Sequence, residues 1–244
     1  MSEPKALTVS HIEWQGGVRI IRSAYPPMDL FEDIADPADW PLLISAEQKT
    51  NPRLMETIGN LDLVPTERRV GGSGASYLMA PFTHVSMDRP SRFTDGRYGV
   101  LYAANFFETA LFETIYHHGR FMIRTAEAPG WSSQFREIIL SVSADLHDLR
   151  TIGLGHPALD PDHYGPSQGL AMALKASGAD GLVYPSIRHF GGACVALFYP
   201  NCASDPKQGR HLDYHWDGQR VDLVRDAMAG TVFRVVDLVM QENL

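Results

Sequence analysis

Residues 90–120, with the sequence PSRFTDGRYGVLYAANFFETALFETIYHHGR, decide the predicted fold of this 244-residue chain. The apolar run at residues 99–103 predicts a strand. Asn105 follows, with Glu108 three residues later, which is the spacing of a capping box, so the pattern predicts a helix over about residues 106–116. A strand that passes directly into an amphipathic helix indicates a domain that mixes both kinds of element.

The remaining pattern alternates strands and helices without a regular βαβ rhythm, which favours an α+β fold over a doubly wound parallel sheet. Further strands are predicted at residues 18–23, 77–85, 138–142, 181–184 and 194–199, and a second helix at residues 167–177, closed by Gly178. Residues 212–216 and 219–224 predict a hairpin around a two-residue turn, and residues 232–239 fit either a strand or a helix.

The chain before the main α/β part has a different pattern. Residues 28–60 are predicted to be mostly helical, with prolines near the helix starts. A Gly-rich, irregular stretch follows at residues 64–76. We therefore predict an N-terminal, mostly helical extension over residues 1–65, packed on a catalytic domain at residues 66–244, although one continuous domain fits the same pattern.

The composition excludes some classes of function. Apolar residues make up 44% of the chain, which is enough for a sizeable core. The net charge is −8 and the isoelectric point about 5.6, so a long nucleic-acid interface is disfavoured and no direct nucleic-acid binding is expected. A small anionic ligand needs only a few arginines and is still allowed.

Cysteine usage and hydropathy predict a cytoplasmic protein. Cys194 and Cys202 are too few for a disulfide framework, which indicates a reducing compartment. The first residues lack the apolar core of a signal peptide, and no run is long enough to cross a membrane, so no membrane partner is expected.

Metal and phosphate motifs are missing. There is no P-loop, HExxH or GxSxG motif. His117 and His118 are adjacent and would point to different sides of a helix, so solvated or capping histidines are expected there. His211 and His215 would share a face of a strand but lack a third ligand. No metal site is predicted.

Glu113 is the side chain that periodicity makes notable. It lies at one edge of the apolar arc of the helix, beside Phe106 and Ala110, where capping does not explain it. From periodicity alone a solvated rim residue is the more common explanation, and a functional acid in a cleft is the alternative. Ser186 follows an apolar strand in the sequence GLVYPSIRHFGGAC, a position that suits a binding loop, although taken alone an ordinary turn serine is the more common explanation.

The segments RFTDGRYGVLYAANFFETALFE and DGLVYPSIRHFGGACVALFYP together resemble the RES domain, a family named for its Arg, Glu and Ser residues. Arg92, Tyr102, Glu113 and Ser186 fall on the family pattern in order. The resemblance covers roughly residues 70–225. Some members carry an active-site Asn eight residues after the Ser, where this chain has Cys194, so Cys194 is either a site residue or an ordinary buried thiol.

The resemblance implies an ADP-ribosyltransferase-like fold, with a mixed or antiparallel sheet core and flanking helices. It also implies an activity, cleavage of the nicotinamide–ribose bond of NAD⁺ as substrate, with no separate cofactor. Glu113 would face the developing sugar cation. Arg92 would hold a phosphate of the pyrophosphate, Tyr102 would pack on the nicotinamide ring, and Ser186 would orient the ribose or amide.

The acceptor of the ADP-ribosyl group is open between inorganic phosphate, as a co-substrate, and water or a protein side chain. Arg188, with Arg19 or Arg22, would add a second anion site, although surface arginines are at least as common an explanation.

The family further implies a bacterial toxin whose partner is an Xre-like helix-turn-helix antitoxin, in a complex that allows a homo-oligomer. Two alternatives to an NAD⁺ phosphorylase or glycohydrolase are carried forward. One is a mono-ADP-ribosyltransferase. The other is a non-catalytic antitoxin-binding module in which Arg92 and Glu113 form a structural salt bridge.

Overall fold

The computed structural model describes residues 7–24, 36–37, 39–40, 58–236 and 239–242, and it has the predicted α+β composition. The described strands are β1 Val9–Arg22, β2 Leu101–Ala104, β3 Trp131–Asp148, β4 Gly181–Pro185, β5 Ala193–Leu197, β6 Ala203–Trp216, β7 Val221–Asp226, β8 Val232–Val236 and β9 Val239–Glu242. The helices are α4 Ala75–Thr83, α5 Phe107–Met122 and α6 Gly165–Ala176, with short 3₁₀ turns η1 Leu61–Leu63, η2 Thr66–Arg68, η3 Pro157–Leu159 and η4 Pro200–Cys202.

All nine described strands belong to one mixed sheet in the order β1-β2-β5-β4-β3-β6-β7-β8-β9, with an additional β1–β3 pairing. That extra pairing closes the first five strands into a ring. The long strand β3 makes this closure because it pairs with β1 along one edge and, along the other, first with β6 and then with β4. Strands β3 and β4 pair in parallel, through His147↔Leu182 and Asp148↔Val183, whereas the other pairs are antiparallel.

Successive side chains of the central strands point into two separate cores, as the period of two in a strand requires. On β2, Leu101 and Ala103 enter one core while Tyr102 and Ala104 enter the other or pack against it. On β5, Cys194 joins the same core as Ala104. The ring is therefore buried on both faces, which explains why its short strands have continuous apolar sequences.

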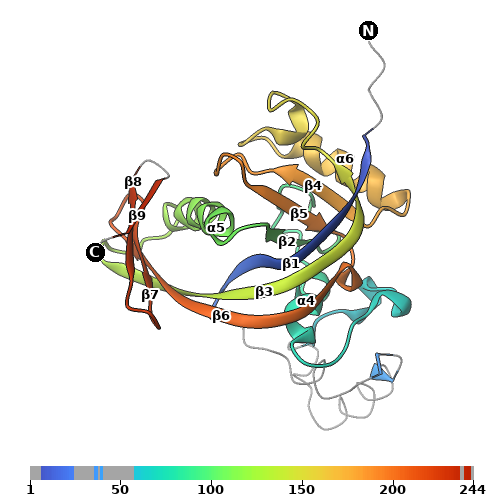
Figure 1. Ribbon diagram of the computed structural model, residues 1–244, viewed down its shortest axis with the longest axis horizontal. Coiled ribbons are helices and arrows are strands. Elements are labelled where there is room, and N and C mark those ends of the chain that lie inside the picture. Colours follow the sequence, from blue (N-terminus) through green and yellow to red (C-terminus); the bar gives the residue numbers. More distant parts are fainter. Residues whose placement is uncertain (1–6, 25–35, 38, 41–57, 237–238, 243–244) are drawn as a thin grey trace.

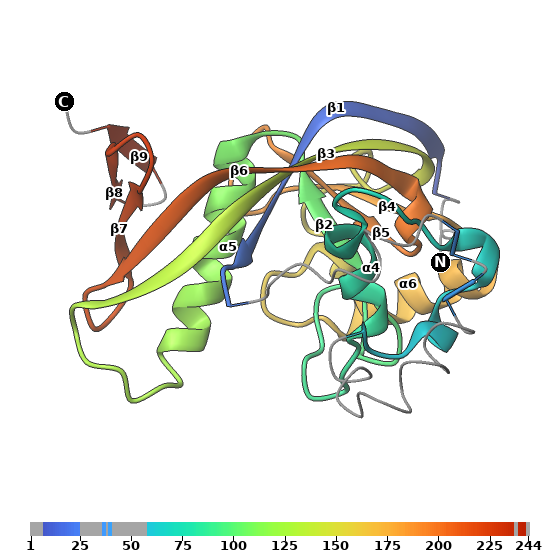
Figure 2. The same ribbon diagram turned by 90° about the horizontal axis from the view of Figure 1, so that it is seen from below.

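The helices cover the two faces of this sheet (Figures 1 and 2). Helix α5 lies on the concave side of the long strands β1, β3 and β6, and α6 packs beside β4. Helix α4 packs on the other core, against β2 and β6. The segment between β2 and α5 is only Asn105 and Phe106, so the start of α5 is fixed next to the sheet.

The predicted strand at residues 77–85 is wrong, because this segment is helix α4 with a proline, Pro81, inside it. Its side chains are buried around most of the helix, which removes the polar face that marks an amphipathic helix. Gly99 passes so close to this helix that an added Cβ would collide with the Pro81 carbonyl oxygen. Packing from both sides thus fixes a helix that the sequence pattern does not reveal.

Three other details differ from the predictions. Strand β1 begins at Val9, well before residue 18. Asn105 does not cap α5, because its Oδ1 accepts a 2.8 Å hydrogen bond from the Ala193 amide, so the predicted capping box is wrong. The hairpin turn spans residues 217–220 rather than two residues. The segment predicted as either a strand or a helix forms strand β8 at residues 232–236, and residues 239–242 form β9.

The helical prediction for residues 28–60 lies mostly outside the described residues. Strand β1 precedes the predicted boundary at residue 65 and yet pairs with β3 in the central sheet, so the first part of the chain contributes to the same sheet as the rest.

Candidate active site

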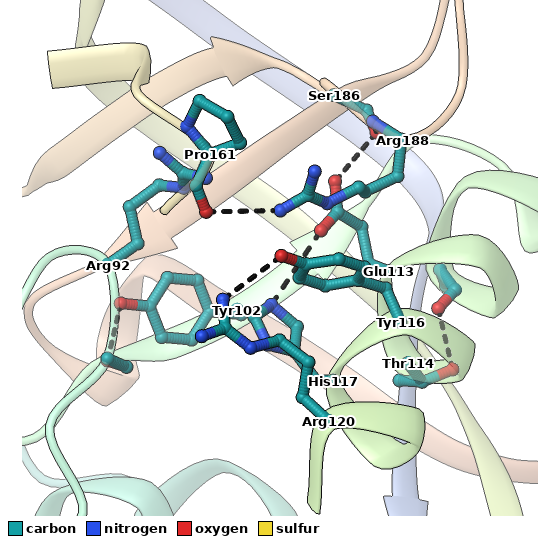
Figure 3. Close-up of polar contacts among 12 residues, drawn as sticks. Arg92, Tyr102, Glu113, Thr114, Tyr116, His117, Arg120, Pro161, Ser186 and Arg188 are labelled. Carbon is teal, nitrogen blue, oxygen red and sulfur yellow. Dashed lines mark hydrogen bonds and ion pairs between the residues drawn. The ribbon is translucent and has the colours of Figure 1, made fainter. Parts of the chain in front are cut away.

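A pocket of about 280 Å³ opens where β1, β2, β4 and β5 meet helix α5. Its walls are mostly apolar, with a few polar groups. The functional side chains that line it are Arg19, Ser91, Arg92, Tyr102, Glu113, Thr114, His117, Tyr184 and Cys194. Of the residues named in the sequence analysis, this list contains Arg19, Arg92, Tyr102, Glu113, His117 and Cys194, although His117 was expected to be solvated or capping. Figure 3 shows that Ser186 and Arg188 lie beside Glu113.

Glu113 stands at the centre of the site. Its side chain is 20% exposed, and Oε1 accepts a 2.7 Å hydrogen bond from Ser186 Oγ. Burial raises the pKa of Glu113 above its ordinary value, while the Ser186 hydrogen bond and the charges of Arg188 and Arg92 oppose that rise. The carboxyl group is therefore partly desolvated and held in one orientation, which a solvated rim residue would not be.

Ser186 is oriented by its own loop. It follows β4, and its Oγ accepts hydrogen bonds from the backbone amides of Arg188 and His189, at 3.2 and 3.0 Å. Because these amides occupy the lone pairs, the hydroxyl hydrogen is directed to Glu113. The loop in turn is fixed to α5, since His189 Nδ1 and Thr109 Oγ1 lie 2.9 Å apart.

Arg92 is 8% exposed, and its guanidinium contacts neutral groups rather than a carboxylate. Nη1 donates a 2.7 Å hydrogen bond to the Asp160 carbonyl oxygen, and the guanidinium lies 4.6 Å from the centre of the Tyr164 ring. No ion pair within 4.0 Å joins Arg92 to Glu113 in the described chain. The structural salt bridge on which the non-catalytic alternative depended is thus not formed.

Tyr102 presents its ring to the pocket because its hydroxyl is already engaged. That oxygen accepts a 2.9 Å hydrogen bond from the Phe93 amide and lies 2.8 Å from Ser91 Oγ. Burial raises the pKa of Tyr102 to about 12, so the phenol stays neutral at physiological pH. The residue therefore offers an apolar, fixed face to a ligand.

Arg188 adds a second guanidinium next to Glu113. Its Cζ lies 3.4 Å from the centre of the Tyr116 ring, and Nη2 donates a 3.2 Å hydrogen bond to the Pro161 carbonyl oxygen. Its buried Nε has no hydrogen-bond partner in the described structure. A buried donor without a partner is unusual in a folded protein.

Cys194 lies both in the core and at the wall of the pocket. It is 4% exposed and belongs to the core, and it also lines the pocket below Glu113. Burial, together with the nearby Glu113 charge, raises the pKa of Cys194 well above its ordinary value. The thiol is therefore protonated and is not a nucleophile in this state.

His117 lines the pocket although it was not predicted there from the sequence, and the same is true of Ser91, Thr114 and Tyr184. His117 lies one turn after Glu113 on α5, and its Nε2 is 3.9 Å from Glu113 Oε2 (Figure 3). Desolvation and the neighbouring guanidiniums lower the pKa of His117 to about 4, so the imidazole is neutral at pH 7. The i,i+4 spacing from Glu113 was the available signal. His118, expected to be solvated or capping, is 6% exposed among aromatic rings.

Arg19 reaches the pocket from β1, where Nη1 donates a 3.2 Å hydrogen bond to the Tyr102 carbonyl oxygen. Burial lowers the pKa of Arg19 to about 10, which leaves it a cation at neutral pH. Arg22, its predicted alternative, instead lies 5.5 Å from the centre of the Phe121 ring. Of the two arginines, Arg19 is the one that can meet a ligand in this pocket.

The described residues also bear on metal binding and on membrane-spanning helices. Within the described ranges, no group of three His, Cys, Asp or Glu side chains is arranged to hold a metal ion. No helix among the described residues is long and apolar enough to cross a membrane.

A fixed carboxylate, the guanidiniums of Arg92 and Arg188 and the ring of Tyr102 thus come together at one pocket of an α+β protein (Figure 3). The chain belongs to the RES domain family, which matches residues 66–217.

Two individual proteins are similar to it. An uncharacterized protein, y4oC, from Sinorhizobium fredii (strain NBRC 101917 / NGR234) is 28% identical over 206 residues, which cover 84% of this chain and 85% of that protein. The crystal structure of the M. tuberculosis MbcT-MbcA toxin-antitoxin complex contains a chain with a TM-score of 0.44 and 13% identity, over 84% of this chain and 87% of that one.

Proposed function

We propose that this protein is the toxin of a bacterial toxin–antitoxin pair and that it cleaves the nicotinamide–ribose bond of NAD⁺. Membership of the RES domain family supports the class of protein. The observation that carries the reaction is the position of Glu113, whose carboxylate is fixed by Ser186 at 2.7 Å in a largely apolar pocket.

The chemistry of the bond suits a single carboxylate. Nicotinamide leaves as a neutral pyridine, so no general acid is needed, and the ribose passes through an oxocarbenium-like state. A negative charge held beside C1′ in a partly desolvated site stabilises that cation more than it stabilises the substrate. In this scheme Glu113 is the catalytic carboxylate.

The neighbouring side chains have complementary roles in binding. Tyr102 would stack on the nicotinamide ring through its exposed face, and Ser186 would keep Glu113 directed at the ribose. Arg92 and Arg188 would hold the pyrophosphate through charge-assisted hydrogen bonds. A volume of about 280 Å³ lies at the lower end for ligand pockets, so the nicotinamide riboside end would enter while the phosphates stay near the arginines at its mouth.

Phosphate, water and a protein side chain can all capture the cation. The proposed acceptor is inorganic phosphate or water, and the group of guanidiniums that surrounds His117 favours an oxyanion. Transfer to a protein is the alternative enzymatic outcome. The proposed partner is a helix-turn-helix antitoxin of the Xre type that silences the enzyme in the cytoplasm.

Mass spectrometry of the products tests the proposal directly. The purified protein is incubated with NAD⁺ in phosphate buffer and in a phosphate-free buffer. Release of nicotinamide with ADP-ribose-1″-phosphate indicates phosphorolysis, ADP-ribose indicates hydrolysis, and a mass increase on a protein indicates transfer. Glu113→Gln, which keeps the shape of the side chain, should abolish nicotinamide release. Near wild-type turnover by that variant would show that the proposed mechanism is wrong.

A further inference from the structure

The segment 160–164, which we call the strap, crosses the site between η3 and α6. It touches both arginines that face Glu113. The Asp160 carbonyl oxygen accepts a 2.7 Å hydrogen bond from Arg92 Nη1, and the Pro161 carbonyl oxygen accepts a 3.2 Å hydrogen bond from Arg188 Nη2. Figure 3 shows Pro161 beside these two arginines. Two successive backbone oxygens therefore stand where two anionic oxygens of a ligand would be held.

A second set of contacts fastens the strap to helix α5. Asp162 Oδ1 accepts hydrogen bonds from Tyr116 Oη at 3.2 Å and from Arg120 Nη1 at 3.3 Å. Arg120 also donates a 3.1 Å hydrogen bond to the Tyr116 hydroxyl, which completes a triangle. The Asp162 side chain is 61% exposed, so this latch lies at the surface and outside the pocket.

The strap has its own internal order. Asp160 Oδ1 accepts 2.8 Å hydrogen bonds from the amides of Asp162 and His163, which makes a compact turn. Its far end is anchored, because Ser167 Oγ donates a 2.6 Å hydrogen bond to the Arg92 carbonyl oxygen. The near end follows η3, whose Ala158 and Leu159 are 1% exposed, so packing holds the chain on both sides of the strap. A displacement of the strap is therefore confined to residues 160–164, between these two anchors.

We propose that the strap is a built-in competitor of the substrate, which occupies the paired-arginine subsite for a pyrophosphate group through the carbonyl oxygens of Asp160 and Pro161 and must swing aside when that group binds. The proposal rests on the proposed function for the identity of the ligand. Hydrogen bonds from guanidinium to phosphate are stronger than those to a neutral carbonyl, so a pyrophosphate displaces the strap. The unpaired Nε of Arg188 would gain a partner in the exchange.

Loosening the latch tests this without touching the pocket. Asp162→Ala removes the acceptor of both α5 contacts, and Asp145→Ala is the matched control, because it removes an exposed partner of His11 on β3. Exposed contacts of this kind stabilise weakly, so hydrogen exchange of the strap amides should be roughly two- to fivefold faster in Asp162→Ala and unchanged in the control. Unchanged exchange of the strap in Asp162→Ala would overturn the proposal.

Inorganic pyrophosphate is the probe for displacement. In the wild-type protein it should speed exchange of the strap amides, since it takes the arginines from the carbonyl oxygens. Slower exchange would mean that the strap closes over the ligand instead, and unchanged exchange at saturation would mean that it does not compete. Either result overturns the proposal.

Kinetics add an independent readout. A closed strap reduces the fraction of the protein that can bind NAD⁺. Asp162→Ala should therefore lower KM for NAD⁺ by the same factor by which it speeds hydrogen exchange of the strap amides. Asp162→Asn keeps an acceptor oxygen but loses the charge that faces Arg120, so its KM should fall between those of the wild type and Asp162→Ala; a KM for Asp162→Ala equal to that of the wild type would overturn the proposal. If no form releases nicotinamide while exchange responds as expected, the proposed function fails and the strap stands. If nicotinamide is released but exchange of the strap amides does not respond, the strap proposal is wrong and the proposed function stands.

Discussion

Ser186 Oγ donates a 2.7 Å hydrogen bond to Glu113 Oε1, and this contact joins the loop after β4 to the middle of helix α5. The two residues are 73 positions apart in the chain. Their contact therefore depends on both β4 and α5 being correctly placed on the sheet. It also orients the carboxyl group on which the proposed reaction depends, and it opposes the rise in the pKa of Glu113 that burial causes.

The first prediction concerns pH. The reaction needs Glu113 ionised, and burial raises its pKa, so kcat/KM should fall on the acidic side at a pH above the ordinary value of 4.5. Ser186→Ala removes a hydrogen bond that favours the charged form, and it should shift this acidic limb to still higher pH. It should also lower kcat by roughly tenfold, since a hydrogen bond to a charged group is lost. Nicotinamide release measured against pH checks both effects, and a limb that stays in place would contradict the assigned role.

The second prediction concerns Arg188. Arg188→Gln keeps some hydrogen-bonding capacity but removes the charge, so KM for NAD⁺ should rise by roughly tenfold or more, with a smaller change in kcat. Arg225→Gln, an exposed change on β7, serves as the control. The acidic limb should also move to higher pH, because Arg188 favours the ionised form of Glu113. A change in kcat alone would indicate that Arg188 does not bind the ground-state substrate.

The third prediction uses the close packing of the Ser186 loop on α5. A Cβ at Gly192 would lie 2.7 Å from Thr109 Cγ2, so Gly192→Ala must push the loop away from the helix. Because small displacements of positioned groups are costly, nicotinamide release should fall by roughly tenfold or more. Thr109→Ala removes the obstructing atoms together with the His189 contact, so the double variant should regain the activity of Thr109→Ala alone. Failure of this rescue would show that Gly192 matters for another reason.

The fourth prediction concerns stability. Asp148 is 3% exposed and joins the ends of β1 and β3, since its carboxylate accepts hydrogen bonds from Ser10 Oγ at 2.8 Å and from Arg150 Nη2 at 2.6 Å. Hydrogen bonding to Arg150 and Ser10 outweighs burial and lowers the pKa of Asp148.

Asp148→Asn should therefore lower the free energy of unfolding by about 2 kcal/mol at about pH 7. A depressed pKa stabilises the fold above the unfolded-state value, and that stabilisation is lost as the pH falls through the folded-state value. The difference between wild type and variant should shrink accordingly in acid. Urea denaturation at several pH values measures it, and a difference independent of pH would contradict this account.

The sequence predicted best those elements whose pattern is local. The strand–helix unit of β2 and α5, the strands β4 and β5, and α6 closed by Gly178 follow from apolar runs, helical periodicity and a glycine with φ of 87°. The strand prediction for the segment of α4 was wrong because this helix is buried on most sides, by β2, β6 and the close approach of Gly99, and therefore has no helical polar periodicity.

The residues of the candidate site also differ in how far the sequence could predict them. Arg92, Tyr102, Glu113 and Ser186 were found only through the family resemblance, since each has an ordinary explanation by itself. The structure brings them together around one pocket, and their catalytic and binding roles stay predictions. His117 could have been found from its spacing to Glu113, whereas nothing local indicates that the strap reaches Arg92 and Arg188.

The closed ring of β1, β2, β5, β4 and β3 has a consequence for synthesis. Strand β5 fills the place between β2 and β4, and it is encoded at residues 193–197, after every residue proposed to act on NAD⁺ except Cys194. The ring around Glu113 therefore cannot close until residues 193–197 have left the ribosome. A product truncated before residue 193 lacks β5, so the proposed reaction cannot begin on a partly made chain of that length.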